Sequence, residues 1–416
     1  MNARRVVITG MGTVNPLAHN VPQTWEKILK GESGIGKITQ FDASTFTCQI
    51  AGEVRGFDWT QHFQEGKQSK ARRLDPFVHF GAAACREALT MAGLKEAPNP
   101  ERAGFAVGSG IGGFHTQQAQ AEVYFTKGGH KRISPFYIPA HIGNIASGYL
   151  SMEFGFKGPN FSVQTACATG NHAIGMAFLA IKSDMADVMF AGGTESTILT
   201  MAVAGFCNLK ALSTHYNESP TKASRPFDKA RDGFVMSEGA GVLFLEEYEH
   251  AKKRGADIIA EVCSVGMTGD AYDLVAPHPE GEGAARSMAM ALSQARIDPS
   301  AVDYINAHGT STEQGDIAEC KAIRKALKND VSRVHVGSTK SMTGHLLGAT
   351  AGLEAIISAL AIRHGVIPAT INLDELDPDC GLTCINKEPI EQKVGVVLSN
   401  SFGFGGHNST LCLKAV

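Results

Sequence analysis

Of the nine cysteines in the chain, Cys167 is the one whose surroundings indicate chemistry. A strand-like segment leads to it, and the small residues around it, with Gly170 among them, allow a sharp turn into a helix. A thiol at a helix N-terminus faces unpaired amides, which favour a thiolate and lower its pKa. Cys167 is therefore predicted to be a nucleophile. The alternative is an inert buried thiol, which is our interpretation of Cys48, Cys85, Cys207, Cys263, Cys320, Cys380, Cys384 and Cys412.

His308 follows a strand-like segment at residues 302–307 and precedes Gly309 and three hydroxyl residues at 310–312. Ligands of α/β proteins bind at the carboxyl ends of strands. The hydroxyls could hold an amide-bearing ligand, or they could cap a helix that starts near residues 313–316. A single histidine is more often structural than catalytic, so both readings stay open here.

Lys340 and His345 also lie between a predicted strand and a predicted helix. A cation near a histidine disfavours the imidazolium, and a neutral ring can donate one N–H to a developing oxyanion. Lys340 could instead form a buried ion pair with Glu319 or Asp316, and the two interpretations are compatible.

Residues 400–408 place three glycines around Phe402 and Phe404 after a strand. This composition predicts a tight, mobile loop whose amides could approach a ligand and whose aromatic ring could act as a gate. A simple glycine-rich turn is the alternative. His308, His345 and His407 lack the spacing or the neighbouring thiols of a zinc site, so we expect no metal and no cofactor.

The elements that must position these residues alternate between strands and helices. Apolar, β-branched runs lie at residues 5–9, 186–191, 242–245, 302–307, 334–337 and 395–401. They predict an α/β fold with buried, partly parallel sheets. Two helices, one beginning near Cys167 and one near His345, each carry a glycine three places on and are apolar around most of their circumference. We interpret them as buried and as the trace of an internal duplication with its seam near 249–257.

Composition excludes several classes of protein. The chain has 416 residues, of which 46 are glycine and only 16 are proline. This is not the composition of a Pro/Gly-rich linker, so the fold itself must require backbone without a side chain at many positions. A net charge of −3 argues against general nucleic-acid binding. No run approaches the roughly 18 apolar residues of a membrane span, and the cysteines form no disulfide framework. We expect a cytoplasmic protein of two to three domains or two packed halves.

The four reactive segments, in this order, resemble the type II β-ketoacyl-acyl carrier protein synthases, the elongating condensing enzymes. The resemblance extends from residues 6–12 to 402–406 and includes Arg225-Pro226-Phe227-Asp228 and residues 232–235. It implies a thiolase-like α/β fold, two related halves in an αβαβα arrangement, with one half at residues 1–254 and the other at 255–416. It also implies a homodimer that acts on acyl- and malonyl-loaded carrier protein.

The same resemblance implies a role for each site residue. Cys167 would carry the acyl group, with the amides of Cys167 and Phe404 as its oxyanion hole. His308 and His345 would stabilise an enolate, and Lys340 and Glu319 would hold the His345 region. Phe404 would gate the acyl tunnel. Thr310 and Thr312 would bind pantetheine, Ile111 and Phe402 would line the substrate site, and the acidic carrier would dock on Lys70, Arg72, Arg73, Lys131, Arg132 and Lys210.

The sequence departs from the family pattern in three segments. His407 and Val275 stand where threonine is usual, and Asp273 stands where histidine is usual. Ser237 stands where glycine is commoner, and we expect no functional consequence of that change. Val275 lacks a hydroxyl that would contact pantetheine. The alternatives are a polyketide-type ketosynthase with the same chemistry, a non-catalytic chain-length partner, which would lack the nucleophile, and a cysteine hydrolase, which would need a histidine–carboxylate pair.

Overall fold

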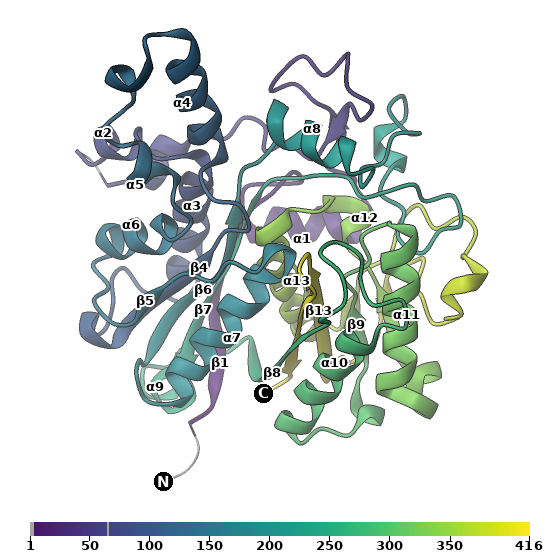
Figure 1. Cartoon of the computed structure of the whole chain (residues 1–416). Helices are drawn as coiled ribbons and strands as arrows, with labels where there is room; N and C mark the ends of the chain where they lie inside the picture. The colour runs from purple at the N-terminus through teal and green to yellow at the C-terminus, as the bar shows by residue number, and fades with distance from the viewer. Residues whose placement is uncertain (1–3, 65) are drawn as a thin grey trace.

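The computed structural model describes residues 4–64 and 66–416, which form a ten-stranded central sheet (Figure 1). Its strands lie in the order β10-β9-β13-β14-β8-β1-β7-β6-β4-β5. Their bounds are β1 Val6–Val14, β4 Ala103–Gly108, β5 Asn160–Phe161, β6 Val188–Glu195, β7 Gly239–Glu247, β8 Ala260–Gly269, β9 Tyr304–Asn306, β10 His335–Gly337, β13 Val396–Gly403 and β14 His407–Lys414.

The sheet repeats one topology twice. Five strands lie on each side of the centre of the sheet. Outward from the centre, the first set is β1, β7, β6, β4 and β5, and the second set is β8, β14, β13, β9 and β10. Within each set the strands therefore follow the same order relative to the chain. The three outer strands of each set are parallel to one another. Strands β7 and β14 each run antiparallel to both of their neighbours. Strands β1 and β8 join the two sets as an antiparallel pair. The expected partly parallel sheets are confirmed.

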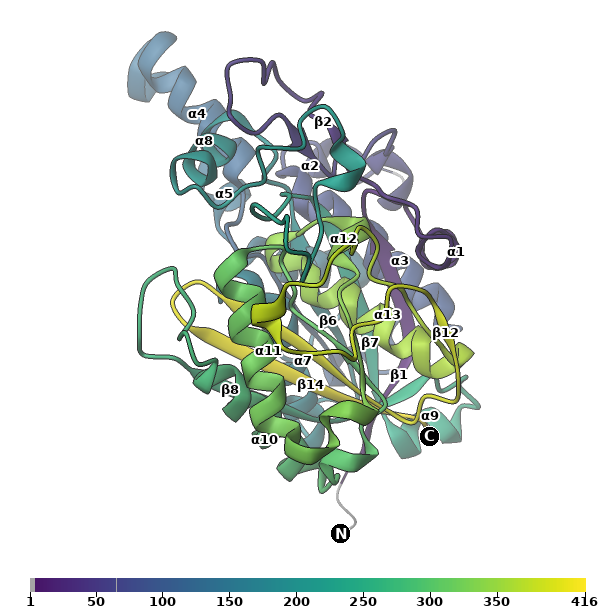
Figure 2. The ribbon, with the colours of Figure 1, turned by 90° about the vertical axis from the view of Figure 1, so that its right-hand side faces the viewer.

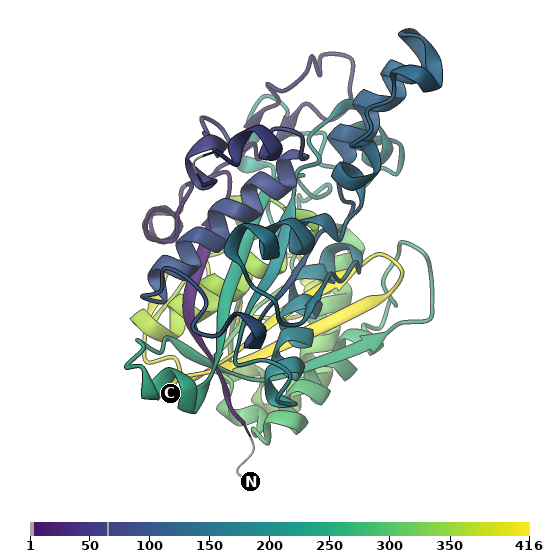
Figure 3. The same cartoon turned by 90° about the vertical axis from the view of Figure 1, so that its left-hand side faces the viewer.

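Helices form three layers around the sheet. On the outside, α3 (Pro76–Met91) and α6 (Ile145–Phe154) cover the first set of strands, while α10 (Glu282–Ala295) and α11 (Glu313–Leu327) cover the second (Figures 2 and 3). Between the two sets lie α7 (Thr169–Lys182) and α13 (Thr350–His364), which contact each other. This is the αβαβα arrangement of the thiolase-like fold.

Smaller elements complete the chain. A short helix, α9 (Tyr248–Lys253), lies at the predicted seam between β7 and β8. No helix of the described residues is both long enough and apolar enough to cross a bilayer. The other helices and strands are α1 Val21–Leu29, α2 Gln68–Ala71, α4 Phe114–Thr126, α5 Tyr137–His141, α8 Thr200–Asn208, α12 Lys340–Thr343, β2 Gly36–Lys37, β3 Ile50–Ala51, β11 Val366–Ile367 and β12 Ile390–Glu391.

Glycines inside strands lie where another element packs closely on the strand backbone. The strands that contain them are longer than the sequence predicted. Strand β1 continues through Gly10 and Gly12 because α3 lies directly against it, and a Cβ at Gly12 would lie 1.9 Å from the carbonyl oxygen of Ala84. Strand β6 similarly continues beyond the pair of glycines at 192–193, where the sequence predicted its end. An apolar run interrupted by glycine thus continues as strand where a helix packs on bare backbone.

The two central helices are related, but with a register different from the predicted one. Each is preceded by a 3₁₀ turn, η4 (Ala166–Ala168) or η8 (Leu347–Ala349), whose first residue has a left-handed backbone, φ 50° at Ala166 and 49° at Leu347. Cys167 therefore corresponds to Gly348, and the predicted match to His345 is wrong by three residues. The helices approach closely: a Cβ at Gly170 would lie 2.7 Å from the amide nitrogen of Gly352.

Candidate active site

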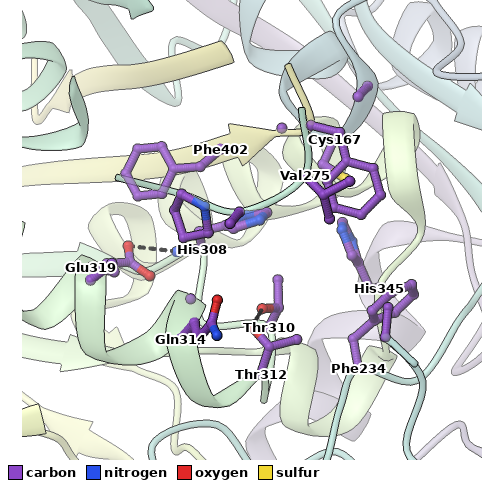
Figure 4. A pocket seen from close by; sticks show the side chains of 18 of the residues that line it. Cys167, Phe234, Val275, His308, Thr310, Thr312, Gln314, Glu319, His345 and Phe402 are labelled. Carbon is purple, nitrogen blue, oxygen red and sulfur yellow. Dashed lines mark hydrogen bonds between the residues drawn. The ribbon is translucent and has the colours of Figure 1, made fainter. Parts of the chain in front are cut away.

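A cavity of about 580 Å³ opens beside the turns that precede α7 and α13. Cys167, His308 and His345, which are distant in sequence, all line it (Figure 4). Cys167 comes from η4, His308 from the end of β9, and His345 from the segment after α12. The structure thus brings together the three reactive residues that the sequence singled out.

Backbone amides surround the Cys167 thiol. The amides of Cys167 and Phe404 both lie against its sulfur. Gly403 makes this possible, because a Cβ there would lie 3.0 Å from the Cys167 nitrogen. The Ser401 hydroxyl donates to the Cys167 carbonyl at 2.9 Å and ties the turn to β13. Two convergent N–H groups beside a nucleophile are the geometry of an oxyanion hole.

Burial around Cys167 favours the protonated form of its thiol. Burial, with a smaller contribution from the Glu195 charge, raises its pKa to about 12, and this outweighs the lowering caused by the Lys340 charge and the two amides. The amides lower the thiol pKa as expected, but burial makes the net shift a rise, opposite to the predicted direction. Cys167 lies in the 3₁₀ turn ahead of α7, under enough protein that the loss of hydration dominates. The proton must leave as the sulfur forms its new bond.

The two histidine rings are adjacent, and their surroundings favour the uncharged form of each. Their centroids lie 5.4 Å apart at 85°. The pKa of each ring is well below its usual value, first because of burial and second because of the Lys340 charge. The sequence named only the second cause. The Nδ1 of His345 shares a 2.9 Å hydrogen bond with the Thr350 hydroxyl. Neutral imidazoles in this position can donate to a substrate oxygen.

Glu319 holds the backbone beside His308, which differs from the predicted role. Its carboxylate accepts hydrogen bonds from the amides of His308 and Gly309 at 2.8 and 2.7 Å. Asn400 donates to the same carboxylate at 3.0 Å. The expectation that Glu319 holds the His345 region is therefore wrong: the carboxylate fixes the other histidine through its main chain.

Lys340 forms a buried ion pair, but with a different partner from those predicted. Its Nζ lies 2.6 Å from a carboxylate oxygen of Glu354, and each side chain is only 1% exposed. The expected pairing with Glu319 or Asp316 is wrong. Glu354 was missed, although its charge in the otherwise apolar α13 was a usable signal.

Breaking the Lys340–Glu354 pair is expected to destabilise the protein strongly. Lys340→Met leaves the carboxylate of Glu354 buried without a partner, a loss of about 3–5 kcal/mol in the free energy of unfolding. The double variant Lys340→Met/Glu354→Gln removes both charges and should recover most of that loss. Urea unfolding at pH 7 measures both. Equal destabilisation of the single and double variants would contradict the pairing.

The remaining predicted substrate residues also line the cavity. Ile111, Thr310, Thr312, Phe402 and Phe404 all contribute to its wall. The hydroxyls of the two threonines share a 2.9 Å hydrogen bond. Although α11 begins just after Thr312, the Thr312 side chain makes no capping bond to it, so the capping interpretation is wrong.

The predicted loop at residues 400–408 is shorter than expected. Phe402 and Gly403 belong to β13, and β14 starts at His407, so a three-residue turn joins two strands. The Gly405 amide donates to the carbonyl of Leu274 at 2.8 Å, which connects this turn to the segment carrying the unusual Asp273 and Val275. Asp273 accepts from the amide of Val275 at 2.8 Å.

The departures from the family pattern at Asp273, Val275 and His407 lie at or near the cavity mouth. Asp273 and Val275 line it, and His407 is exposed on the neighbouring strand, its ring 6.3 Å from that of His172. The basic residues predicted for docking are all exposed: Lys70, Arg72, Arg73, Lys131, Arg132 and Lys210. Within the described ranges, no group of three or more histidine, cysteine or acidic side chains is placed to hold a metal ion.

Comparison with protein families matches almost the whole chain. Residues 3–251 match the model of the β-ketoacyl synthase N-terminal domain, and residues 259–374 match that of the C-terminal domain. A 3-oxoacyl-acyl-carrier-protein synthase 2 from Coxiella burnetii is 48% identical, with 100% of both chains covered. A protein of the same name from Synechocystis is 46% identical over 100% of this chain and 99% of that protein.

Solved structures share the fold. A type II polyketide ketosynthase in complex with its acyl-carrier protein superposes with a TM-score of 0.91 at 32% identity, with both chains fully covered. The ishigamide ketosynthase/chain length factor superposes with a TM-score of 0.92 at 33% identity, again over the full length of both chains.

Proposed function

The chain belongs to the β-ketoacyl synthase family, an acyltransferase family of fatty acid elongation, and from that premise we propose which of its residues perform the condensation. The reaction joins an acyl group to malonyl-carrier protein with loss of CO₂ and gives a β-ketoacyl product two carbons longer. Identity to fatty acid elongation enzymes, at 46–48%, exceeds the 32–33% to polyketide ketosynthases.

Cys167 carries the acyl group in the first half of the reaction. Its sulfur attacks the thioester carbonyl of the acyl carrier, the bond from carbonyl carbon to pantetheine sulfur breaks, and the thiol proton leaves with the departing pantetheine thiol. The amides of Cys167 and Phe404, which lie against the sulfur, stabilise the oxyanion of the tetrahedral intermediate. The partial exposure of Cys167 to the cavity lets the thioester reach it.

His308 and His345 act in the second half. The malonyl carboxylate leaves as CO₂, and its bonding electrons form an enolate whose oxygen accepts hydrogen bonds from the two neutral rings. The enolate carbon attacks the acyl-Cys167 carbonyl, the bond from that carbon to the Cys167 sulfur breaks, and the released thiolate takes a proton from solvent. Because Lys340 and burial keep both rings neutral, they donate hydrogen bonds without forming imidazolium.

The observation that carries this assignment is the meeting of one thiol, two amides and two neutral histidines in one cavity. A cysteine hydrolase would orient its histidine with a carboxylate, whereas the Nδ1 of His345 pairs with the Thr350 hydroxyl. Purified protein with acyl- and malonyl-carrier protein should give β-ketoacyl-carrier two carbons longer, scored by mass spectrometry. Release of free fatty acid instead would favour the hydrolase.

The carrier protein docks on the exposed basic residues. Of these, Lys210 lines the cavity, and the Arg73 guanidinium, just after α2, lies 4.3 Å from the centroid of the Phe136 ring in the segment after η3 (Gly129–Arg132). Exposed cations near a binding site attract an acidic partner and raise its association rate.

Charge reversal tests this docking surface. Lys70→Glu/Arg72→Glu is expected to raise the KM for acyl-carrier protein roughly tenfold at low salt, with kcat little changed, because steering is lost. The difference should shrink in high salt. Lys252→Glu/Lys253→Glu, on α9 at the other end of the molecule (Figure 1), is the matched control. Equal KM values for both double variants would contradict the docking site.

The enzyme acts as a homodimer of two-part subunits. Strand β5 is an edge of the sheet, and beside it α6 exposes Met152, while α4 has no buried residue and exposes Phe125, 82% accessible. Exposed apolar side chains beside an open strand edge favour a second copy. Sedimentation should give about twice the 44.1 kDa chain mass; a monomer at micromolar concentration would contradict this.

The repeated strand order supports a division into halves at residues 1–254 and 255–416, since α9 ends at Lys253 and β8 begins at Ala260. The nine cysteines are all free. Free thiols in this number support a cytoplasmic location.

A further inference from the structure

We propose that Glu195 is a positioning residue for acyl transfer: its carboxylate fixes the acyl-side wall of the cavity by joining Ile111 to the segment of Leu347 and Gly348. The inference rests on the proposed function, in which this cavity holds the acyl chain. None of the roles assigned above involves Glu195, which is fully buried at the end of β6.

Four donors from two distant segments converge on this carboxylate. One oxygen accepts from the Ser109 hydroxyl at 2.7 Å and from the Ile111 amide at 3.3 Å. The other accepts from the Gly110 amide at 2.7 Å and from the Gly348 amide at 3.0 Å. The first three donors follow β4, and the fourth lies in η8, so the carboxylate links the segment after β4 to the turn before α13.

The linked segments form part of the cavity wall. Gly110, Ile111 and Leu347 all line it, next to Cys167. The fit around the carboxylate is tight: a Cβ at Gly110 would lie 2.8 Å from its oxygen, and one at Gly348 would lie 2.7 Å from it. Any change in the carboxylate therefore moves wall residues on both sides of the acyl site.

The chemistry of the group explains why an amide cannot replace it. Four donors occupy the roughly four lone-pair positions of an ionised carboxylate. Burial raises the pKa of Glu195 to about 7, against the lowering by these four hydrogen bonds. A glutamine at this position would direct its own N–H₂ group at two of the four donors. Those two hydrogen bonds would be lost, and the donors would face another donor.

The effect should be confined to acyl transfer. The carboxylate makes no hydrogen bond to either histidine or to the groups that fix them: His308 is fixed through Glu319, and His345 by the Thr350 hydroxyl and by a hydrogen bond from its amide to the Val235 carbonyl. Its one link to the His345 segment is the Gly348 amide, and both of the hydrogen bonds that hold His345 are independent of that contact. Loss of the Glu195 contacts should displace the acyl wall while the site of malonyl decarboxylation remains.

The test compares Glu195→Gln with Glu238→Gln. Glu238 is also a buried carboxyl whose pKa burial raises to about 7, and it accepts from the Val54 amide and the Ser196 hydroxyl away from the cavity. For each protein we would measure kcat/KM for Cys167 acylation with carrier substrates of increasing chain length. Malonyl-carrier decarboxylation without primer would be measured in parallel.

For Glu195→Gln we expect kcat/KM for acylation to fall about tenfold or more with long chains and less with short ones, while decarboxylation stays within about twofold. Glu238→Gln should change neither rate by more than about twofold. Wild-type acylation in Glu195→Gln, or equal losses of both activities, would overturn the proposal. If Glu195→Gln does not fold, Ser109→Ala, which removes one donor, must give a smaller loss of the same kind. A wild-type enzyme that fails to elongate would instead refute the proposed function.

Discussion

Cys167→Ala is expected to abolish both acyl-enzyme formation and condensation. The variant loses the only group in the account that bonds to the acyl carbon, and removal of a catalytic nucleophile lowers turnover by roughly 10⁶-fold in a studied acyl-transfer enzyme. Folding should be preserved, because cysteine and alanine differ only by the sulfur atom of a half-buried side chain, and the Cys167 thiol donates no hydrogen bond on which the turn depends. Acylation is measured with a radiolabelled acyl-carrier protein.

The matched control is Cys384→Ala, which removes a half-buried thiol that does not line the cavity. It should load and elongate at the wild-type rate. A Cys167→Ala protein that still retains radiolabelled acyl groups after denaturation would refute the nucleophile assignment.

His308→Ala is expected to separate the two halves of the reaction. Cys167 should still be acylated within a few-fold of the wild-type rate, because its oxyanion hole is built from the amides of Cys167 and Phe404. Malonyl decarboxylation should fall by roughly 10²–10³, the cost of removing one oxyanion donor. Release of labelled CO₂ from malonyl-carrier protein measures the second step.

His308→Gln provides the control for this prediction, since its amide can restore a neutral N–H donor. It should recover part of the decarboxylation rate that His308→Ala loses. If decarboxylation continues at the wild-type rate in His308→Ala, the role given to this ring is wrong.

Much of the site was predictable because its residues follow strands. Cys167, His308 and His345 each follow a strand-like run and precede a helix with glycine nearby, and in an α/β fold such positions gather at one end of the sheets. The family resemblance added roles to positions that local pattern had already singled out, and the family membership it implied is confirmed.

The errors have a common physical origin in tertiary context. The sign of the Cys167 pKa shift depends on how deeply the turn is buried, which a local sequence does not reveal. The partner of Lys340 depends on how α12 packs against α13, and so Glu354 was missed. The register between the two central helices depends on the left-handed backbone of Ala166 and Leu347. Alanine and leucine rarely adopt this conformation, so the sequence gives no sign of these turns.

The most direct test of the account is peptide mapping of the enzyme after a single turnover with acyl-carrier protein in the absence of malonyl substrate. The acyl mass should appear on the peptide containing Cys167, and it should disappear when malonyl-carrier protein is added and a β-ketoacyl product two carbons longer forms. An acyl mass on a different cysteine, or elongation without any acyl-enzyme, would contradict the account.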